Sequence, residues 1–455
     1  MSLNTLFSNK RTGRASLASG EEARTEYQRD FDRIIFASAF RRLQNKTQVF
    51  PLPGSVFVHN RLTHSLEVAS VGRSLGSLIG DFIVDKYAAD LTEESSQFYK
   101  HSLYNVISSA CLCHDIGNPA FGHSGEDAIA SFFSKNESTL KSNFSLAEWA
   151  DFVNFEGNSN AIRTLTQQQQ GKTEGGIQLT YTTLASIIKY PCEATAKTKG
   201  IIHRKKFGFF QSEKETFLDI AEKTTMVKDS DNPLIYFRHP FVWLVEAADD
   251  ICYTIIDLED AHRLGIVEFS TCKELMINLI KSDGTSDLKK VEAQLEKITN
   301  KNDKIAFLRA KSIGFLIENA KRTYEANFES IVNTTFKTPL LDVVNTHSSG
   351  AISAIVKFSV ENIYNHRSVV EIENAGYNVM YELLQHFVPP ALKDKDSRTK
   401  SEQMALKLLP PQFIYENESA YRKTLGVLDY VSGMTDNYAT DLYRKIKGID
   451  IGMTV

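Results

Sequence analysis

Metal-binding side chains stand in three well-separated segments of this chain. His114 and Asp115 are adjacent in CLCHDIGNPAFGHSGED, where an apolar run meets a loop that contains glycine and proline. His64 lies upstream in RLTHSLEV, and Asp249 and Asp250 lie far downstream in EAADDICYTIID. Imidazole nitrogens and carboxylate oxygens together form a mixed ligand set that suits a catalytic divalent cation. Spacing alone does not decide whether Asp249 or Asp250 is the ligand.

Helices are the elements that have to bring these groups together. Apolar residues recur at helical spacing over Leu62–Ile83. A second helix, from about Val106, should end close to Gly117–Pro119, because proline disfavours helix in the residue before it. A third helix is predicted over Val242–Leu258, and it surrounds both downstream carboxylates with apolar residues, where unpaired charges are costly to bury. A bound cation removes that cost, so the sequence favours a metal centre over a solvated acidic face.

The rest of the chain is also predicted to be mainly helical. Long amphipathic patterns cover Ile305–Ile331, 369–387 and 402–409, and strand signals are few. Residues 198–210 are interpreted as a short hairpin or a basic loop. We therefore expect an all-α fold with an N-terminal extension (1–26), a catalytic core (27–264) and a helical C-terminal region (265–455) that completes the active site and forms the interfaces between subunits.

Bulk properties limit the classes of protein. The 455 residues are 42% hydrophobic and 24% charged, which is ordinary for a globular protein. The net charge of -4 provides no overall basic field, so any site for a polyanion has to be built locally. The polar N-terminus lacks the apolar core of a signal peptide, and no apolar run is long enough to span a bilayer. With its five cysteines interpreted as reduced thiols, the protein is expected to be cytoplasmic and to contact no membrane.

These segments and several others resemble a known family. RLTHS, CHDIGNPAFGHSGE and EAADDICYTIIDLEDA form the H…HD…D pattern of the HD superfamily of metal-dependent phosphohydrolases. Together with RDFDRIIFASAFRRLQNKTQVF, NFEGNSNAIRTL, IIKYP and YVSGMTDNYATDLY they resemble, more narrowly, the bacterial deoxyguanosine triphosphate triphosphohydrolases, from about Arg29 to Tyr443. The resemblance implies hydrolysis of dGTP, or of dNTPs more broadly, to the deoxynucleoside and intact triphosphate, through attack of water at the α-phosphorus.

The resemblance also implies a ligand set. His64, His114, Asp115 and Asp249 are expected to hold one divalent metal ion per subunit, so that Asp249 rather than Asp250 is the ligand. Mn²⁺ or Mg²⁺ is expected first, and Co²⁺, Fe²⁺ and Zn²⁺ are compatible with the same donors. Such an ion polarises a phosphate and lowers the pKa of a coordinated water to about 7.

His123 and Glu126 match the family's catalytic positions. His123 is expected to transfer a proton at the reacting phosphate or the leaving 5′-oxygen, and Glu126 to orient its imidazole, although the assignment of the two roles is open. Proton transfer of this kind contributes about 10²–10⁴-fold. The other matched positions are expected to bind the substrate: Arg61, Lys189 and Tyr190 at the phosphates, Tyr253 and Asp257 at the deoxyribose, Gln48 near the base or sugar, and Glu373 at the guanine edge.

Partners follow from the same resemblance. Members of the family assemble as rings of six subunits, so a homo-oligomer, specifically a hexamer, is expected. Some members bind single-stranded DNA. Here the basic residues between Lys197 and Lys206, interleaved with Phe207, Phe209 and Phe210, are a candidate surface for stacking bases and contacting phosphates. An exposed hairpin without a ligand is the alternative.

Two further functions stay open at this point. Another enzyme of the HD superfamily, a phosphodiesterase or a 5′-nucleotidase, would cut a different phosphate ester. A regulatory protein would bind a nucleotide at an inactive HD site. The complete set of metal ligands, together with His123 and Glu126, argues against the regulatory interpretation.

Overall fold

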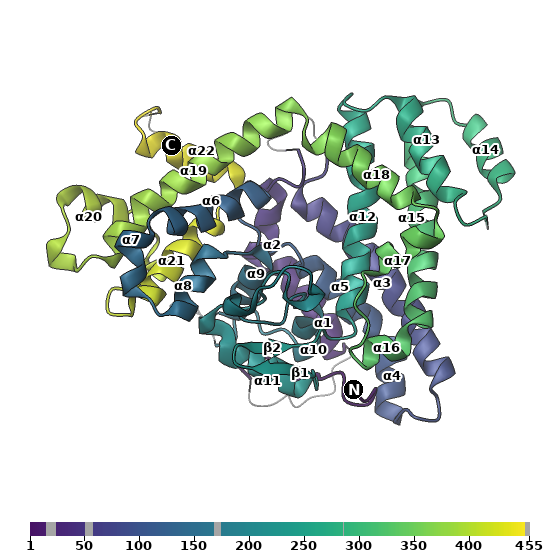
Figure 1. The fold of residues 1–455 in the computed structure, drawn as a ribbon, viewed down its shortest axis with the longest axis horizontal. Coiled ribbons are helices and arrows are strands. Elements are labelled where there is room, and N and C mark those ends of the chain that lie inside the picture. Colours follow the sequence, from purple (N-terminus) through teal and green to yellow (C-terminus); the bar gives the residue numbers. More distant parts are fainter. Residues whose placement is uncertain (15–23, 51–57, 168–173, 285, 451–455) are drawn as a thin grey trace.

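The chain folds into a body of helices (Figure 1). Residues 1–14, 24–50, 58–167, 174–284 and 286–450 of a computed structural model are described. Within these ranges the only strands are β1 (Lys228–Asp231) and β2 (Leu234–Tyr236), an antiparallel pair at the edge of the molecule. The expectation of an all-α fold is confirmed. The helices of the first half are α1 Glu26–Phe36, α2 Ser38–Arg42, α3 Arg61–Lys86, α4 Glu93–His101, α5 Leu103–Cys113, α6 Gly122–Lys135, α7 Glu137–Leu140, α8 Leu146–Val153, α9 Gly157–Thr166, α10 Tyr181–Ile187, α11 Lys214–Lys223 and α12 Val242–Arg263.

Ten more α-helices make up the second half of the described chain. They are α13 Phe269–Ile280, α14 Leu288–Glu296, α15 Lys301–Ala326, α16 Phe328–Val332, α17 Leu340–His347, α18 Ala351–Ser359, α19 Arg367–Leu392, α20 Lys400–Leu406, α21 Ala420–Ser432 and α22 Asp436–Ile446. A π-helical turn, Val360–Tyr364, joins α18 to the short link before α19. The amphipathic pattern over Ile305–Ile331 is divided between two helices, since α15 ends at Ala326 and α16 begins at Phe328.

Helices α3, α5 and α12 carry the candidate metal ligands. Helix α3 begins with a reciprocal capping box between Asn60 and Thr63, which satisfies backbone donors at its first turn. Its glycines allow α5 to pack closely, since a β-carbon at Gly76 would lie 2.8 Å from the Tyr104 α-carbon. Helix α5 ends at Cys113, ahead of the predicted Gly117–Pro119 stop, and leaves the His-Asp doublet in the turn beyond it.

Two hydrophobic clusters form the core. The first cluster gathers the apolar faces of α1, α3, α5, α10, α12 and α15. The second is built from α6 and α8 together with α19, α21 and α22, and Figure 1 shows α6 lying beneath the long helix α19. Helix α6 therefore belongs to the first half of the chain by sequence and packs with the C-terminal helices in space. The boundary proposed at residue 264 stays a prediction.

The N-terminal segment lies against the body. Leu6 is buried, and the fully enclosed guanidinium of Arg11 donates to Asp30 Oδ1 at 2.6 Å and pairs with Glu26. Residues 15–23 of the predicted N-terminal extension lie outside the described part of the chain. Among the described helices, none combines the length and apolar character that crossing a bilayer requires.

Candidate metal centre and active site

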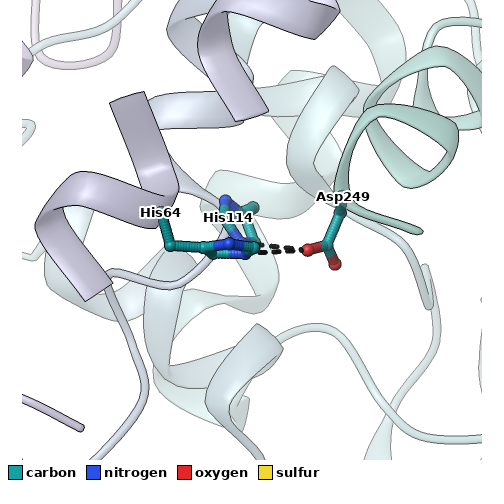
Figure 2. A group of neighbouring side chains, drawn as sticks. All are labelled: His64, His114 and Asp249. Atoms are coloured by element: carbon teal, nitrogen blue, oxygen red, sulfur yellow. Dashed lines mark hydrogen bonds and ion pairs between the residues drawn. The ribbon is translucent and has the colours of Figure 1, made fainter. Parts of the chain in front are cut away.

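Three of the predicted metal ligands converge (Figure 2). Asp249 Oδ1 lies 3.2 Å from His64 Nε2 and 3.4 Å from His114 Nε2, and one donor atom from each residue falls within 4.8 Å of the others. The ligands come from α3, from the turn after α5 and from α12, so segments far apart in sequence meet at one point. This convergence is the geometry that a mononuclear site requires.

The unpaired atoms at this point fit a cation. His114 Nδ1–H donates to the carbonyl of Cys111 at 2.6 Å, which leaves Nε2 as the free nitrogen. That Nε2 is buried and makes no hydrogen bond. Burial alone would raise the pKa of Asp249, but the facing imidazoles of His114 and His64 hold it below its usual range. A carboxylate and lone-pair nitrogens that point at one another are the donors a divalent ion uses.

Asp115, the fourth predicted ligand, lies at the edge of this cluster. Its Oδ2 is 3.5 Å from His114 Nε2 and accepts a hydrogen bond from Arg61, while Oδ1 accepts one from Asn118. Its role as a ligand stays a prediction. The expected choice of Asp249 over Asp250 as the ligand agrees with the geometry, because Asp250 is not part of the cluster. Burial raises the pKa of Asp250 to about 8.

The cluster lies on a cavity of about 500 Å³ that most of the predicted site residues line. His64 and Asp257 stand behind its wall. Gln48 contributes a buried amide oxygen that has no hydrogen-bond partner, as expected of a group that contacts a ligand. The predicted residues that line the cavity are Gln48, Arg61, His114, Asp115, His123, Glu126, Lys189, Tyr190, Asp249, Tyr253 and Glu373.

His123 and Glu126 form a hydrogen-bonded pair on the first turns of α6. His123 Nδ1 lies 2.7 Å from Glu126 Oε2, and the imidazole is open to the cavity, with 82% of the side chain exposed. Glu126 Oε1 accepts from the backbone N–H of Gly157 at 2.7 Å. The hydrogen bond that His123 donates to Glu126 raises the pKa of His123. Burial would raise the pKa of Glu126, but the bond to His123 holds it below its usual value. The pair can keep an imidazolium facing the cavity.

Two lysines bring positive charge to the wall of the cavity. Lys189 Nζ lies 3.1 Å from Glu246, and Lys206 Nζ donates to Glu156 at 2.7 Å. Burial would lower the pKa of each lysine, but the facing carboxylate raises it, so both stay charged. Lys189 was predicted to contact phosphate. Lys206 was predicted only as part of a DNA-contacting surface and not of this cavity, because nothing in the run KKFGFF distinguishes it from its neighbour Lys205.

Tyr364 is a second residue that sequence reasoning missed. Its hydroxyl donates to Asp257 Oδ2 at 2.7 Å, and its ring stacks on Tyr253 with a centroid distance of 5.6 Å. It lines the cavity, whereas Asp257, which is 2% exposed, does not. Burial raises the pKa of Asp257 to about 8. Tyr364 lies more than a hundred residues beyond Asp257, and no pattern in ENIYNHR marks it as a site residue.

The predicted DNA-binding surface is wrong in its aromatic half. Phe207, Phe209 and Phe210 have no exposed surface; Phe209 stacks on Phe217 at 4.1 Å, and the other two join the second hydrophobic cluster. Residues 198–210 form a loop with one 3-10 turn, Ile202–Arg204, rather than a hairpin. Their rings are therefore unavailable to stack on bases, although several basic side chains of the segment remain on the surface.

Comparison with known proteins places the chain in a family. Residues 343–445 match the model of a phosphohydrolase-associated domain. The chain is 36% identical to a deoxyguanosinetriphosphate triphosphohydrolase-like protein of Synechocystis, over 99% of this chain and 100% of the relative. A protein of the same name from Pseudomonas aeruginosa is 36% identical over 98% and 99% of the two chains, and one from Listeria monocytogenes is 31% identical over 99% and 100%.

A helical fold that gathers His, His and Asp beside a polar cavity belongs to the class of HD-type phosphohydrolases. Within that class, the chain is a member of the deoxynucleoside triphosphate triphosphohydrolase family.

Proposed function

We propose that this protein hydrolyses deoxynucleoside triphosphates, with dGTP preferred, to the deoxynucleoside and inorganic triphosphate. The observation that carries the proposal is the convergence of two imidazoles and Asp249 on a cavity that also holds the His123–Glu126 pair and two charged lysines. A divalent ion at that point supplies positive charge to a phosphate and makes water more acidic. The names of the relatives support the same substrate class.

Proton transfer is assigned to the His123–Glu126 pair on α6. His123 presents its Nε2 to the cavity, and Glu126 holds the imidazole through Nδ1 and stabilises its protonated form. A protonated imidazole at this place donates to the leaving 5′-oxygen of the deoxynucleoside. The buried anchor of Glu126 on the Gly157 backbone limits the freedom of the pair, as proton transfer along a defined direction requires.

Substrate binding is assigned to three walls of the cavity. Lys189 and Lys206 face the triphosphate, and each exchanges its carboxylate partner for phosphate oxygens when the substrate enters. Tyr253 and Tyr364 form a stacked aromatic wall, to which we assign the deoxyribose; an aromatic ring against C2′ would exclude a 2′-hydroxyl. Glu373, an exposed residue of α19 that lines the cavity, offers a carboxylate to the donor edge of guanine.

Product analysis tests this proposal. The purified protein is incubated with each of the four dNTPs and with GTP, in Mg²⁺ or Mn²⁺, and the products are separated by ion exchange. Release of triphosphate in step with deoxynucleoside, fastest from dGTP, is the expected result. Release of pyrophosphate or orthophosphate would assign the site to another phosphohydrolase reaction.

The matched variants are Asp249→Ala and Asp441→Ala. The first removes the carboxylate that both imidazoles face, so turnover and Mn²⁺ binding should disappear together. The second makes the same change on the exposed face of α22 and should alter neither.

A further inference from the structure

The turn that leads into α6 has an unusual backbone. Phe121 has φ 59° and ψ 20°, and the next residue, Gly122, has φ 57°. Glycine adopts this left-handed conformation freely, but a bulky residue such as phenylalanine rarely does. Phe121 directly precedes the helix that carries His123 and Glu126, so its conformation sets the direction in which α6 starts. Surrounding contacts have to hold it there.

One of those contacts comes from the first residue of α22. Asp436 is 1% exposed, and its Oδ1 accepts the backbone N–H of Phe121 at 3.0 Å. Its Oδ2 accepts the backbone N–H of Thr47 at 2.9 Å and the Thr47 hydroxyl as well. A single carboxylate thus joins the turn before α6 to the segment that carries Gln48. Asp436 lies in the run SGMTDNYA, which matched the family without a role.

A second contact comes from α19. Gly376 has no side chain, and a β-carbon built there would lie 2.7 Å from the β-carbon of Phe121 and even closer to its ring. The phenyl group therefore rests directly on the backbone of α19. Any larger residue at 376 would push Phe121, and with it the start of α6.

On its other side the turn packs against Arg61, beside the candidate metal centre. A β-carbon at Gly122 would lie 2.7 Å from Nη2 of Arg61, whose Nη1 donates to Asp115. The turn is therefore confined between the C-terminal helices and the ion pair beside the candidate ligands. If contacts on one side displace the turn, His123 is therefore expected to move relative to the metal ligands.

We infer that Asp436 and Gly376 are positioning residues, through which the C-terminal region holds Phe121 in its left-handed conformation and places the His123–Glu126 pair against the metal centre. Neither residue lines the cavity; Gly376 acts on it through Phe121, and Asp436 acts through Phe121 and Thr47. The inference rests on the proposed function for its catalytic consequence. Its structural half, the restraint of the turn, does not depend on that function.

Two substitutions test the inference from opposite sides of the turn. Asp436→Asn keeps the shape of the side chain but replaces one acceptor oxygen with an amide, so it cannot accept from both partners. Gly376→Ala adds only a methyl group, inside a helix where alanine is otherwise favoured over glycine. The controls make the same changes at exposed helical positions, Asp441→Asn on α22 and Gly314→Ala on α15, where a β-carbon would meet nothing within 4 Å.

Three quantities are measured on the full-length protein. Steady-state kinetics with dGTP yield kcat and KM, titration with Mn²⁺ yields the metal affinity, and hydrogen exchange followed by mass spectrometry reports the amides of residues 119–127. Both test variants should lose about 100-fold in kcat, the loss typical of a small misplacement of catalytic groups. Their Mn²⁺ affinity should stay within about threefold of wild type, and their 119–127 amides should exchange at least about tenfold faster.

The outcomes separate the inference from the proposed function. Unchanged exchange at 119–127 in both variants would overturn the inference, whatever the activity. So would a kcat within twofold of the controls, or a parallel loss of kcat, Mn²⁺ binding and thermal stability, which marks a general structural role. A wild-type protein that hydrolyses no dNTP would refute the proposed function, and faster exchange in the variants alone would still support the restraint of the turn.

Discussion

Replacing Glu126 by glutamine tests the chemistry of the site most directly. The carboxylate lies 2.7 Å from His123 Nδ1 and raises the pKa of that imidazole. Glutamine keeps the oxygen that accepts from Gly157 but presents a neutral amide to His123. The pKa of His123 in the variant should therefore fall towards its ordinary value of about 6.5. The imidazole itself stays in place.

The size and the sign of the effect follow from the protonation state. The reaction needs protonated His123, so activity is present below the raised pKa and is lost as the pH rises through it. In Glu126→Gln the alkaline limb of the kcat/KM profile should move to lower pH. At pH values above both limbs, a pKa lower by one should reduce the activity about tenfold. His123→Ala removes the acid altogether and should cost more, about 10²–10⁴-fold in kcat.

The assay is the pH–rate profile with dGTP, measured for wild type, Glu126→Gln, His123→Ala and the control Glu137→Gln. Glu137 is exposed on α7 and pairs only with Lys141 among the described contacts, so its variant should follow the wild-type profile. An alkaline limb that stays in place in Glu126→Gln would refute Glu126 as the cause of the raised pKa of His123. A larger loss in Glu126→Gln than in His123→Ala would make Glu126 the group that transfers the proton.

Three further changes have expected outcomes. Tyr364→Phe removes the hydroxyl that bonds Asp257, so kcat/KM for dGTP should fall about tenfold, and the preference for dGTP over dideoxy-GTP should shrink in the same assay. Lys206→Met should raise KM for dGTP about tenfold or more, because one cation is lost from the triphosphate wall, while Mn²⁺ titration should show unaltered metal affinity. Arg163→Met leaves two buried carboxylates unpaired and should cost about 3–5 kcal/mol in urea unfolding; the exposed Arg322→Met should cost less than about 1 kcal/mol.

Local pattern was enough to predict the helices that carry the candidate metal ligands. The apolar period over α3, α5 and α12 reflects contacts within a few turns, whereas Pro119 predicted the end of α5 only approximately, because the helix stops earlier, at Cys113. The same reasoning could not choose between Asp249 and Asp250, since adjacent residues on a buried helix have the same composition around them. Only the packing of α12 against α3 selects the one that faces His64.

Contacts between distant segments account for what the sequence did not predict. Lys206 and Tyr364 enter the cavity from loops and turns whose course depends on the whole fold, so no spacing rule finds them. The interpretation of Phe207 and Phe210 as exposed rings failed for the same reason. An alternation of basic and aromatic residues looks identical whether the rings face solvent or, as here, a second hydrophobic cluster formed with helices far along the chain.

The sharing of that second cluster between early and late helices has a consequence for biosynthesis. The apolar faces of α6 and α8 leave the ribosome well before α19, α21 and α22 exist to cover them. Translation from Lys135 to Arg367 takes roughly 10 to 50 s at usual elongation rates. During that interval the nascent chain exposes Phe132 and Phe133, which are fully buried in the finished protein, so chaperone engagement is expected at this stage and premature termination before α19 should yield an insoluble product.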